Sequence, residues 1–135
     1  MIVGIGVDIV AIHRMEKTLE RHDNKLPEKL LTAEEFSEFS QHSQPAMFLA
    51  KRFAVKEAVA KAFGTGFRNG LQHHHIGLTH TELGCPQLIF YETAKDWIEK
   101  QGITNTHVSL SDEKDTVIAY VILEANANNA VSGSV

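Results

Sequence analysis

The chain has 135 residues, of which 43% are hydrophobic and 22% charged, and its formal net charge is -4. This length fits one domain with a modest core, and the composition excludes wholesale disorder. The negative charge argues against general nucleic-acid binding, and no apolar stretch reaches the roughly 20 residues of a membrane span. Cys85 is the only cysteine, so an internal disulfide is excluded, and we expect a cytoplasmic protein without a signal peptide.

The first predicted element is a buried β-strand from Ile2 to Val10. One face of this strand is apolar throughout and consists of Val3, Ile5, Val7 and Ile9. The other face places Asp8 beside Gly4 and Gly6, where no side chain blocks an approaching ligand. Taken alone, Asp8 is equally explained as a strand-end residue that bonds a nearby turn.

An amphipathic helix is predicted next, over Ala11 to His22. Its apolar stripe follows the spacing i, i+3, i+7 and consists of Ile12, Met15 and Leu19. Three basic residues, Arg14, Lys17 and Arg21, lie together on an outer face. A basic helix face of this kind is most often simply solvated.

Two further helices are predicted before the middle of the chain. Residues 32–35 (Thr-Ala-Glu-Glu) form a capping box, which predicts the start of a short helix. The longest helix covers Ala46 to Phe63 and is apolar nearly all round, so we expect it to be buried. Gly64 can end it as a C-cap, and the composition of residues 65–70 predicts a loop.

The second half of the chain reads mostly as strands. They are predicted at residues 76–83, 87–91, 107–111 and 116–123, with one helix at residues 93–100. The last two strands form a hairpin, and the order of elements indicates a single α+β domain over residues 1–125. Residues 126–135 are rich in Asn, Ala, Ser and Gly, which predicts a disordered tail.

Glu57 is unusual because its helical face is otherwise made mainly of small or apolar residues. A lone carboxylate there is costly unless it is paired or bound to a metal. Lys61 stands one turn further on, and helix spacing alone favours a surface ion pair between Glu57 and Lys61. Asp8 and Glu57, if they meet, offer the hard oxygen ligands that Mg²⁺ prefers. Sequence spacing leaves open whether they meet.

Two motifs combine in this chain. The first is G-x-G-x-D-[IV]-x at residues 4–10, and the second is F-x-x-K-E-A-x-x-K-A at residues 53–62, followed by a Gly-Thr-Gly loop at residues 64–66. Together they resemble the holo-acyl-carrier-protein synthases, the small trimeric bacterial type of the 4'-phosphopantetheinyl transferase superfamily. The likeness covers nearly the whole chain apart from the tail.

This resemblance implies both a fold and a reaction. The fold is an antiparallel sheet packed on a long buried helix, in a homotrimer that holds coenzyme A between subunits. The reaction moves the 4'-phosphopantetheine group of coenzyme A to a serine of apo acyl carrier protein, in support of fatty acid biosynthesis. Adenosine 3',5'-bisphosphate is released, and the cofactor is Mg²⁺. Neither a nucleic acid nor a membrane is implied as a partner.

The resemblance also implies roles for individual residues. Asp8 and Glu57 match the Mg²⁺ ligands and are catalytic together with Lys61, the general base being Glu57 or a metal-bound water. The residues implied to contact the coenzyme are Arg52, Lys56, Lys61, Gly64, Gly66 and His107. Arg14 and Arg21 are implied to dock the acidic carrier protein. One departure is Asp112, which stands where many relatives carry a histidine.

Other interpretations remain for the same residues. The carboxylate pair would also serve a magnesium enzyme that hydrolyses a nucleotide or diphosphate, and the chain could be a module that binds coenzyme A or a carrier protein without turnover. The run His73-His74-His75 invites a zinc interpretation. We reject it because consecutive histidines diverge and no cysteine or carboxylate is spaced to complete a tetrahedron, so we expect a loop there.

Overall fold

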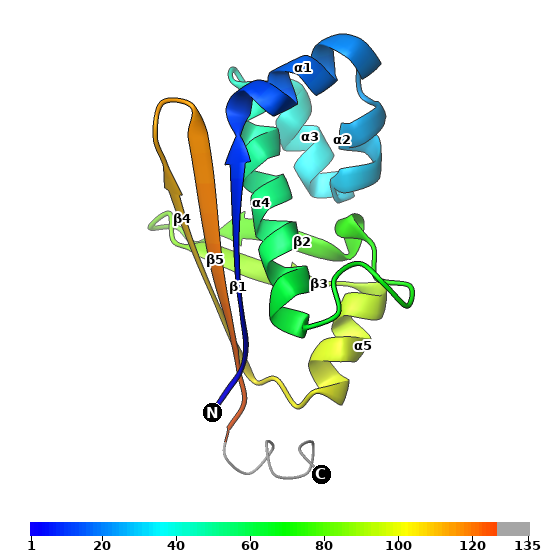
Figure 1. The fold of residues 1–135 in the computed structure, drawn as a ribbon, viewed down its shortest axis with the longest axis vertical. Coiled ribbons are helices and arrows are strands. Elements are labelled where there is room, and N and C mark those ends of the chain that lie inside the picture. The colour runs from blue at the N-terminus through cyan, green and yellow to red at the C-terminus, as the bar shows by residue number, and fades with distance from the viewer. Residues whose placement is uncertain (127–135) are drawn as a thin grey trace.

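A long central helix organises the molecule, and sheet and helices pack around it (Figure 1). The computed structural model describes residues 1–126. The helices in this range are α1 (Ile12–His22), α2 (Lys25–Leu30), α3 (Ala33–Gln41), α4 (Pro45–Phe63) and α5 (Glu92–Lys100), with a short 3-10 turn η1 (His73–His75). The strands are β1 (Ile2–Ala11), β2 (Ile76–His80), β3 (Pro86–Phe90), β4 (Asn105–Asp112) and β5 (Thr116–Glu124).

The strands form two antiparallel sheets. The larger has the order β1-β5-β4, and the smaller pairs β2 with β3. In the larger sheet Asp8 of β1 stands opposite Ala119 of β5, which in turn stands opposite Leu110 of β4. In Figure 1 this sheet lies along one side of α4, and α1, α2 and α3 gather at one end of the helix. The α+β architecture agrees with the sequence prediction.

Strand β1 approaches α4 so closely that main chain meets main chain. A Cβ atom at Gly4 would lie 1.8 Å from the carbonyl oxygen of Ala62, and one at Gly6 would lie 1.8 Å from that of Ala58. Only glycine fits at such a distance. We expected these glycines to leave room for a ligand, and this was wrong, because the helix itself fills the space. The close contact places Asp8, further along the same face, at the edge of α4.

The apolar face of β1 points away from the core, which corrects the prediction of a buried strand. Ile5 is 55% exposed and Ile9 is 66% exposed. Ile118 and Tyr120 of the neighbouring strand continue this exposed surface. We call it the outer sheet face, and it consists of Val3, Ile5, Val7, Ile9, Ile118 and Tyr120. The buried side of β1 carries the glycines and ends at the fully buried Val10.

Local signals in the sequence account for the start of α3 and the end of α4. Thr32 Oγ1 accepts a hydrogen bond from the Glu35 backbone N–H at 3.2 Å, and Glu35 Oε1 accepts from the Thr32 backbone N–H at 3.0 Å, which confirms the capping box. Gly64 ends α4 with a left-handed φ of 88°, as its C-cap role predicts. Helix α2 was not predicted, and its buried residues are Pro27 and Leu30.

Two further expectations concern a membrane span and the C-terminal tail. None of the helices in the range 1–126 combines the length and the apolar character that crossing a bilayer requires. Apart from residue 126, the predicted tail lies outside the described residues.

Candidate functional site

Lys61 and Asp8 form the first part of the site, where β1 meets α4. Lys61 Nζ donates a hydrogen bond to Asp8 Oδ1 at 3.1 Å and another to the Val7 carbonyl oxygen at 2.9 Å. The Asp8 side chain is only 17% exposed, whereas that of Lys61 is 56% exposed. The predicted ion pair between Glu57 and Lys61 is therefore wrong, because the partner of Lys61 in this structure is the strand carboxylate.

Glu57 finds its partner in a segment that we had expected to be a simple loop. Its Oε2 atom lies 3.2 Å from Nε2 of His73, and both side chains are about one-third exposed. His73 begins the 3-10 turn η1, which corrects the loop prediction there. Spacing in the sequence gives no signal for this contact, because 16 residues and a turn separate the two side chains.

The two carboxylates come from different elements and share one neighbourhood. Glu57 stands one helical turn before Lys61 on α4, and Lys61 reaches across to Asp8. Lys61 thus contacts one of the two carboxylates and stands one helical turn from the other, and both carboxylates are partly open to solvent. The donor set fits Mg²⁺, which commonly takes one or two protein carboxylates and fills its remaining positions with waters and phosphate oxygens. Among residues 1–126, no cluster of three or more His, Cys, Asp or Glu side chains is arranged for a metal ion.

Arg52 and Lys56 lie on a different face of α4 and form a buried cluster with Glu35. Lys56 Nζ lies 2.8 Å from Glu35 Oε1 and also donates to the Ile76 carbonyl oxygen. Glu35 Oε2 accepts the Leu78 backbone N–H at 3.0 Å and lies 3.5 Å from Arg52 Nε. Burial lowers the pKa of the Lys56 ammonium below its usual value, although Glu35 opposes the shift.

This cluster changes the interpretation of the two basic residues. Lys56 is 1% exposed and has no open side for a phosphate group, so the expectation of a coenzyme contact there is wrong. Arg52 is also buried, and its guanidinium carbon lies 4.2 Å from the centre of the Phe48 ring. Its Nη2 atom lies 3.5 Å from Oε2 of a second carboxylate, Glu38. The sequence identifies Glu35 only as a member of the capping box and gives no sign of its contacts with Arg52 and Lys56.

The segment after α4 offers open backbone. Gly64 and Gly66 both have positive φ angles, 88° and 67°. The Gly64 N–H donates to the Lys61 carbonyl and the Gly66 N–H to that of Ala60, which closes the helix end. Within residues 1–126, no atom outside the adjoining residues lies within 4 Å of a Cβ built at either glycine. The predicted approach of a coenzyme to this backbone stays a prediction.

His107 lies apart from these groups on β4. Its Nε2 atom is 3.0 Å from Glu124 Oε1 of β5, and both side chains are exposed. The hydrogen bond from His107 lowers the pKa of the Glu124 carboxyl below its usual range. In residues 1–126 no hydrogen bond or ion pair joins His107 to Asp8, Glu57 or Lys61, so its predicted coenzyme contact stays a prediction.

The basic residues of α1 are exposed, as a docking surface requires. Arg14 does more than face solvent, because its guanidinium carbon lies 5.3 Å from the ring centre of Phe53. Phe53 stands one turn before Glu57 on α4. Arg14 therefore borders the carboxylate site, whereas Arg21 lies two turns further along α1. Carrier docking by the two residues stays a prediction.

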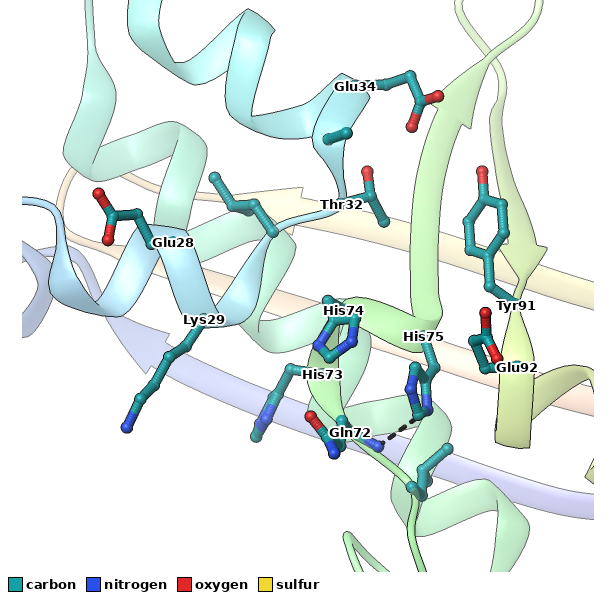
Figure 2. A pocket seen from close by; sticks show the side chains of 13 residues that line it. Glu28, Lys29, Thr32, Glu34, Gln72, His73, His74, His75, Tyr91 and Glu92 are labelled. Atoms are coloured by element: carbon teal, nitrogen blue, oxygen red, sulfur yellow. Dashed lines mark hydrogen bonds between the residues drawn. The ribbon is translucent and has the colours of Figure 1, made fainter.

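The described residues form two large hollows, and the first includes His73, the partner of Glu57. The first has a volume of about 830 Å³, and Figure 2 shows the rings of His73, His74 and His75 pointing in different directions along its wall. The second, of about 800 Å³, lies between the start of α4 and strand β4 and has Lys51, Arg52 and Cys85 in its lining. Asp8, Glu57 and Lys61 line neither hollow within residues 1–126.

Known proteins resemble this chain in sequence. The sequence profile of the 4'-phosphopantetheinyl transferase superfamily matches residues 4–121. A holo-[acyl-carrier-protein] synthase from Nitrosospira multiformis is 48% identical over 124 residues, a match that covers 92% of this chain and 99% of that protein. The motifs at residues 4–10 and 53–62 both fall inside the matched range.

Solved structures resemble it in fold as well. The holo-[acyl-carrier-protein] synthase of Neisseria meningitidis superposes with a TM-score of 0.87 at 44% identity, covering 92% of this chain and 99% of that one. A holo-(acyl-carrier-protein) synthase from Bacillus anthracis, in complex with CoA (3',5'-ADP), superposes with a TM-score of 0.77 at 34% identity. That match covers 93% of this chain and 99% of the other.

Proposed function

We propose that this chain, which belongs to the 4'-phosphopantetheinyl transferase superfamily, transfers the 4'-phosphopantetheine group of coenzyme A to a serine of apo acyl carrier protein. The products are holo acyl carrier protein and adenosine 3',5'-bisphosphate. The observation that supports the proposal is the meeting of β1 and α4, where Lys61 bonds Asp8 one helical turn beyond Glu57 and both carboxylates are partly exposed.

The cofactor in this proposal is Mg²⁺, held by Asp8 and Glu57. When bound, it would neutralise negative charge on the pyrophosphate of coenzyme A, which the two carboxylates would otherwise repel. The partial exposure of both carboxylates supports this assignment, because a ligand that arrives from solvent can reach them.

The chain's own residues supply the proton transfer and the orientation. The carrier serine oxygen forms a bond to the phosphorus next to the pantetheine arm, and the bond from that phosphorus to the bridging oxygen breaks. The bridging oxygen leaves with adenosine 3',5'-bisphosphate, and Glu57 takes the serine proton. Lys61 has three N–H donors and uses two of them on Asp8 and Val7. The third has no partner within residues 1–126 and is proposed to bond the leaving phosphate.

The proposed coenzyme contacts lie at three places: the glycine segment after α4, the hollow of about 800 Å³ and His107 on β4. Gly64 and Gly66 offer open backbone next to Lys61. Arg52 and Lys51 line the hollow of about 800 Å³, which is a suitable size for a nucleotide part. His107 is a further proposed contact, and the buried Lys56 is not among them. The coenzyme bound to the Bacillus anthracis relative supports the choice of ligand.

We also propose a homotrimer with the sites between subunits. The outer sheet face supports association, because contiguous exposed apolar surfaces of this kind mark interaction sites. Covering Ile5, Ile9 and Tyr120 would remove them from water. A cytoplasmic location is part of the same proposal and fits the single exposed Cys85, which needs no oxidising compartment.

Intact-mass analysis tests the reaction directly. Apo acyl carrier protein is incubated with this protein, coenzyme A and Mg²⁺, with and without a chelator. We expect the carrier to gain one phosphopantetheine group, and the chelator to prevent the gain. Release of inorganic phosphate without a mass gain would instead indicate a hydrolase, and tight carrier binding without any product would indicate a binding module.

A further inference from the structure

His73 contacts the one carboxylate that the proposed reaction uses as a base. Its Nε2 atom lies 3.2 Å from Glu57 Oε2. A carboxylate oxygen only accepts hydrogen bonds, so this contact requires the imidazole proton on Nε2. The bond engages Oε2 of Glu57, and within residues 1–126 no hydrogen bond engages Oε1, which can face a metal ion or a substrate proton.

The imidazole ring is itself held in place by aromatic packing. The Phe67 ring lies parallel to it, with a centroid distance of 3.7 Å and an interplanar angle of 19°. The Phe53 ring is also nearly parallel, at 5.9 Å and 12°. Phe53 belongs to α4 and Phe67 to the segment that follows Gly64 and Gly66. The stack therefore fixes His73 against both the helix that carries Glu57 and the segment proposed to contact the coenzyme.

We infer that His73 is a positioning residue that fixes the orientation of the Glu57 carboxylate. A free glutamate on a helix surface samples several rotamers, and each productive encounter must select one. A hydrogen bond from a ring that is held by stacking on Phe67 and Phe53 restricts this freedom before the substrates arrive. The role of Glu57 as ligand and base rests on the proposed function, but the orientation of its side chain by His73 can be tested separately.

Three variants separate the hydrogen bond from the ring. His73→Phe keeps an aromatic ring between Phe67 and Phe53 and removes the donor. His73→Gln places an amide N–H at the reach of Nε2 and restores a donor without the ring. His74→Phe is the matched control, because His74 is the exposed neighbour in η1 and its ring packs against His75 rather than Glu57.

Two measurements are made on each variant. The first is binding of Mn²⁺, used as a probe for the magnesium site and followed by the electron-spin signal of the free ion in the presence of coenzyme A. The second is the separate determination of kcat and of the KM for apo acyl carrier protein. We expect His73→Phe to weaken Mn²⁺ binding and to lower kcat, each by about tenfold, with KM changed less than about twofold. We expect His73→Gln to recover most of both losses and His74→Phe to match the unmodified protein.

Other outcomes overturn the inference, the proposed function, or both. Equal Mn²⁺ affinity and kcat in His73→Phe and the unmodified protein would show that Glu57 needs no partner. A His73→Gln variant no better than His73→Phe would assign the effect to the ring instead of the bond. If the unmodified protein binds Mn²⁺ but transfers nothing, the proposed function fails while the Mn²⁺ comparison still decides the role of His73. Absence of Mn²⁺ binding in the unmodified protein would overturn both.

Discussion

The ammonium group of Lys56 lies 2.8 Å from Glu35 Oε1, and both side chains are almost completely buried. The same carboxylate caps α3 through Thr32 and accepts a backbone N–H of β2 from Leu78. One side chain therefore joins three elements, α3, α4 and β2. Glu35 is a structural centre of the molecule, separate from the proposed catalytic residues.

We expect Glu35→Gln to lower the free energy of unfolding by about 3 kcal/mol, because it leaves the buried Lys56 without its anionic partner. Urea unfolding measures the change. Glu38→Gln is the control, since the Glu38 side chain is 58% exposed and its pair with Arg52 is worth about 1 kcal/mol or less. Equal losses in the two variants would contradict a central role for Glu35.

The pH dependence of stability follows from Lys56. Burial lowers the pKa of its ammonium in the folded protein below the ordinary 10.5. Between the lowered pKa and 10.5 the unfolded chain therefore binds more protons than the folded one, so the contribution of Lys56 to stability rises with pH through that window. Urea unfolding of the unmodified protein and of Lys56→Met should show a difference that shifts in favour of the unmodified protein as the solution becomes more alkaline. A constant difference would count against the shift.

We expect Asp8→Asn and Glu57→Gln each to reduce phosphopantetheine transfer by about 1000-fold. Loss of a metal ligand removes several kcal/mol of transition-state stabilisation. Both side chains are partly exposed, so the urea midpoint should stay close to that of the unmodified protein. Intact-mass kinetics measures transfer, and Glu99→Gln on the exposed face of α5 is the control. Full activity in either variant would disprove the metal assignment.

Gly6→Ala tests the contact between β1 and α4. Its new Cβ atom would lie 1.8 Å from the Ala58 carbonyl oxygen, so strand and helix must separate. We expect a loss of about 3 kcal/mol in the free energy of unfolding, at the upper end of ordinary overpacking. At Gly77 the nearest atom to a new Cβ is a Thr32 methyl at 3.4 Å, so Gly77→Ala should cost much less. Similar losses at both positions would contradict the proposed cause.

Arg21→Glu tests docking of the acidic carrier protein on α1. We expect the KM for the carrier to rise about five- to tenfold and its dependence on salt to weaken, while kcat changes little. Arg21 is the better probe than Arg14, which also packs over Phe53. Lys95→Glu on α5 makes the same charge change at an exposed site away from α1. An unaltered KM in Arg21→Glu would argue against docking there.

The elements that the sequence predicted well are those with purely local signals. Helix α4 is apolar nearly all round and ends at a glycine, and α3 begins with a capping box, so both can be predicted without distant residues. Helix α2 was missed because it is only six residues long and contains Pro27. The exposure of the β1 face was also missed, since an alternating pattern does not say which of two faces a core will cover.

The candidate site was predictable only in part. The motifs identified Asp8, Glu57 and Lys61, and the structure brings Lys61 to Asp8. The partners of Glu57 and Lys56 were not predictable, because His73 and Glu35 are 16 and 21 residues away in the chain and only the fold brings them near. Helix spacing predicts Lys61 as the partner of Glu57, whereas in the structure the partner is His73, which only the tertiary fold brings near.

The contact of β1 with α4 at Gly4 and Gly6 has a mechanical consequence. No side chain separates the two backbones there, so a closer approach would meet steep van der Waals repulsion. Thermal fluctuations can then widen the gap between strand and helix but cannot narrow it. Asp8 lies on this strand and Glu57 on this helix. The distance between their backbones is therefore strongly limited from below and less strongly limited from above.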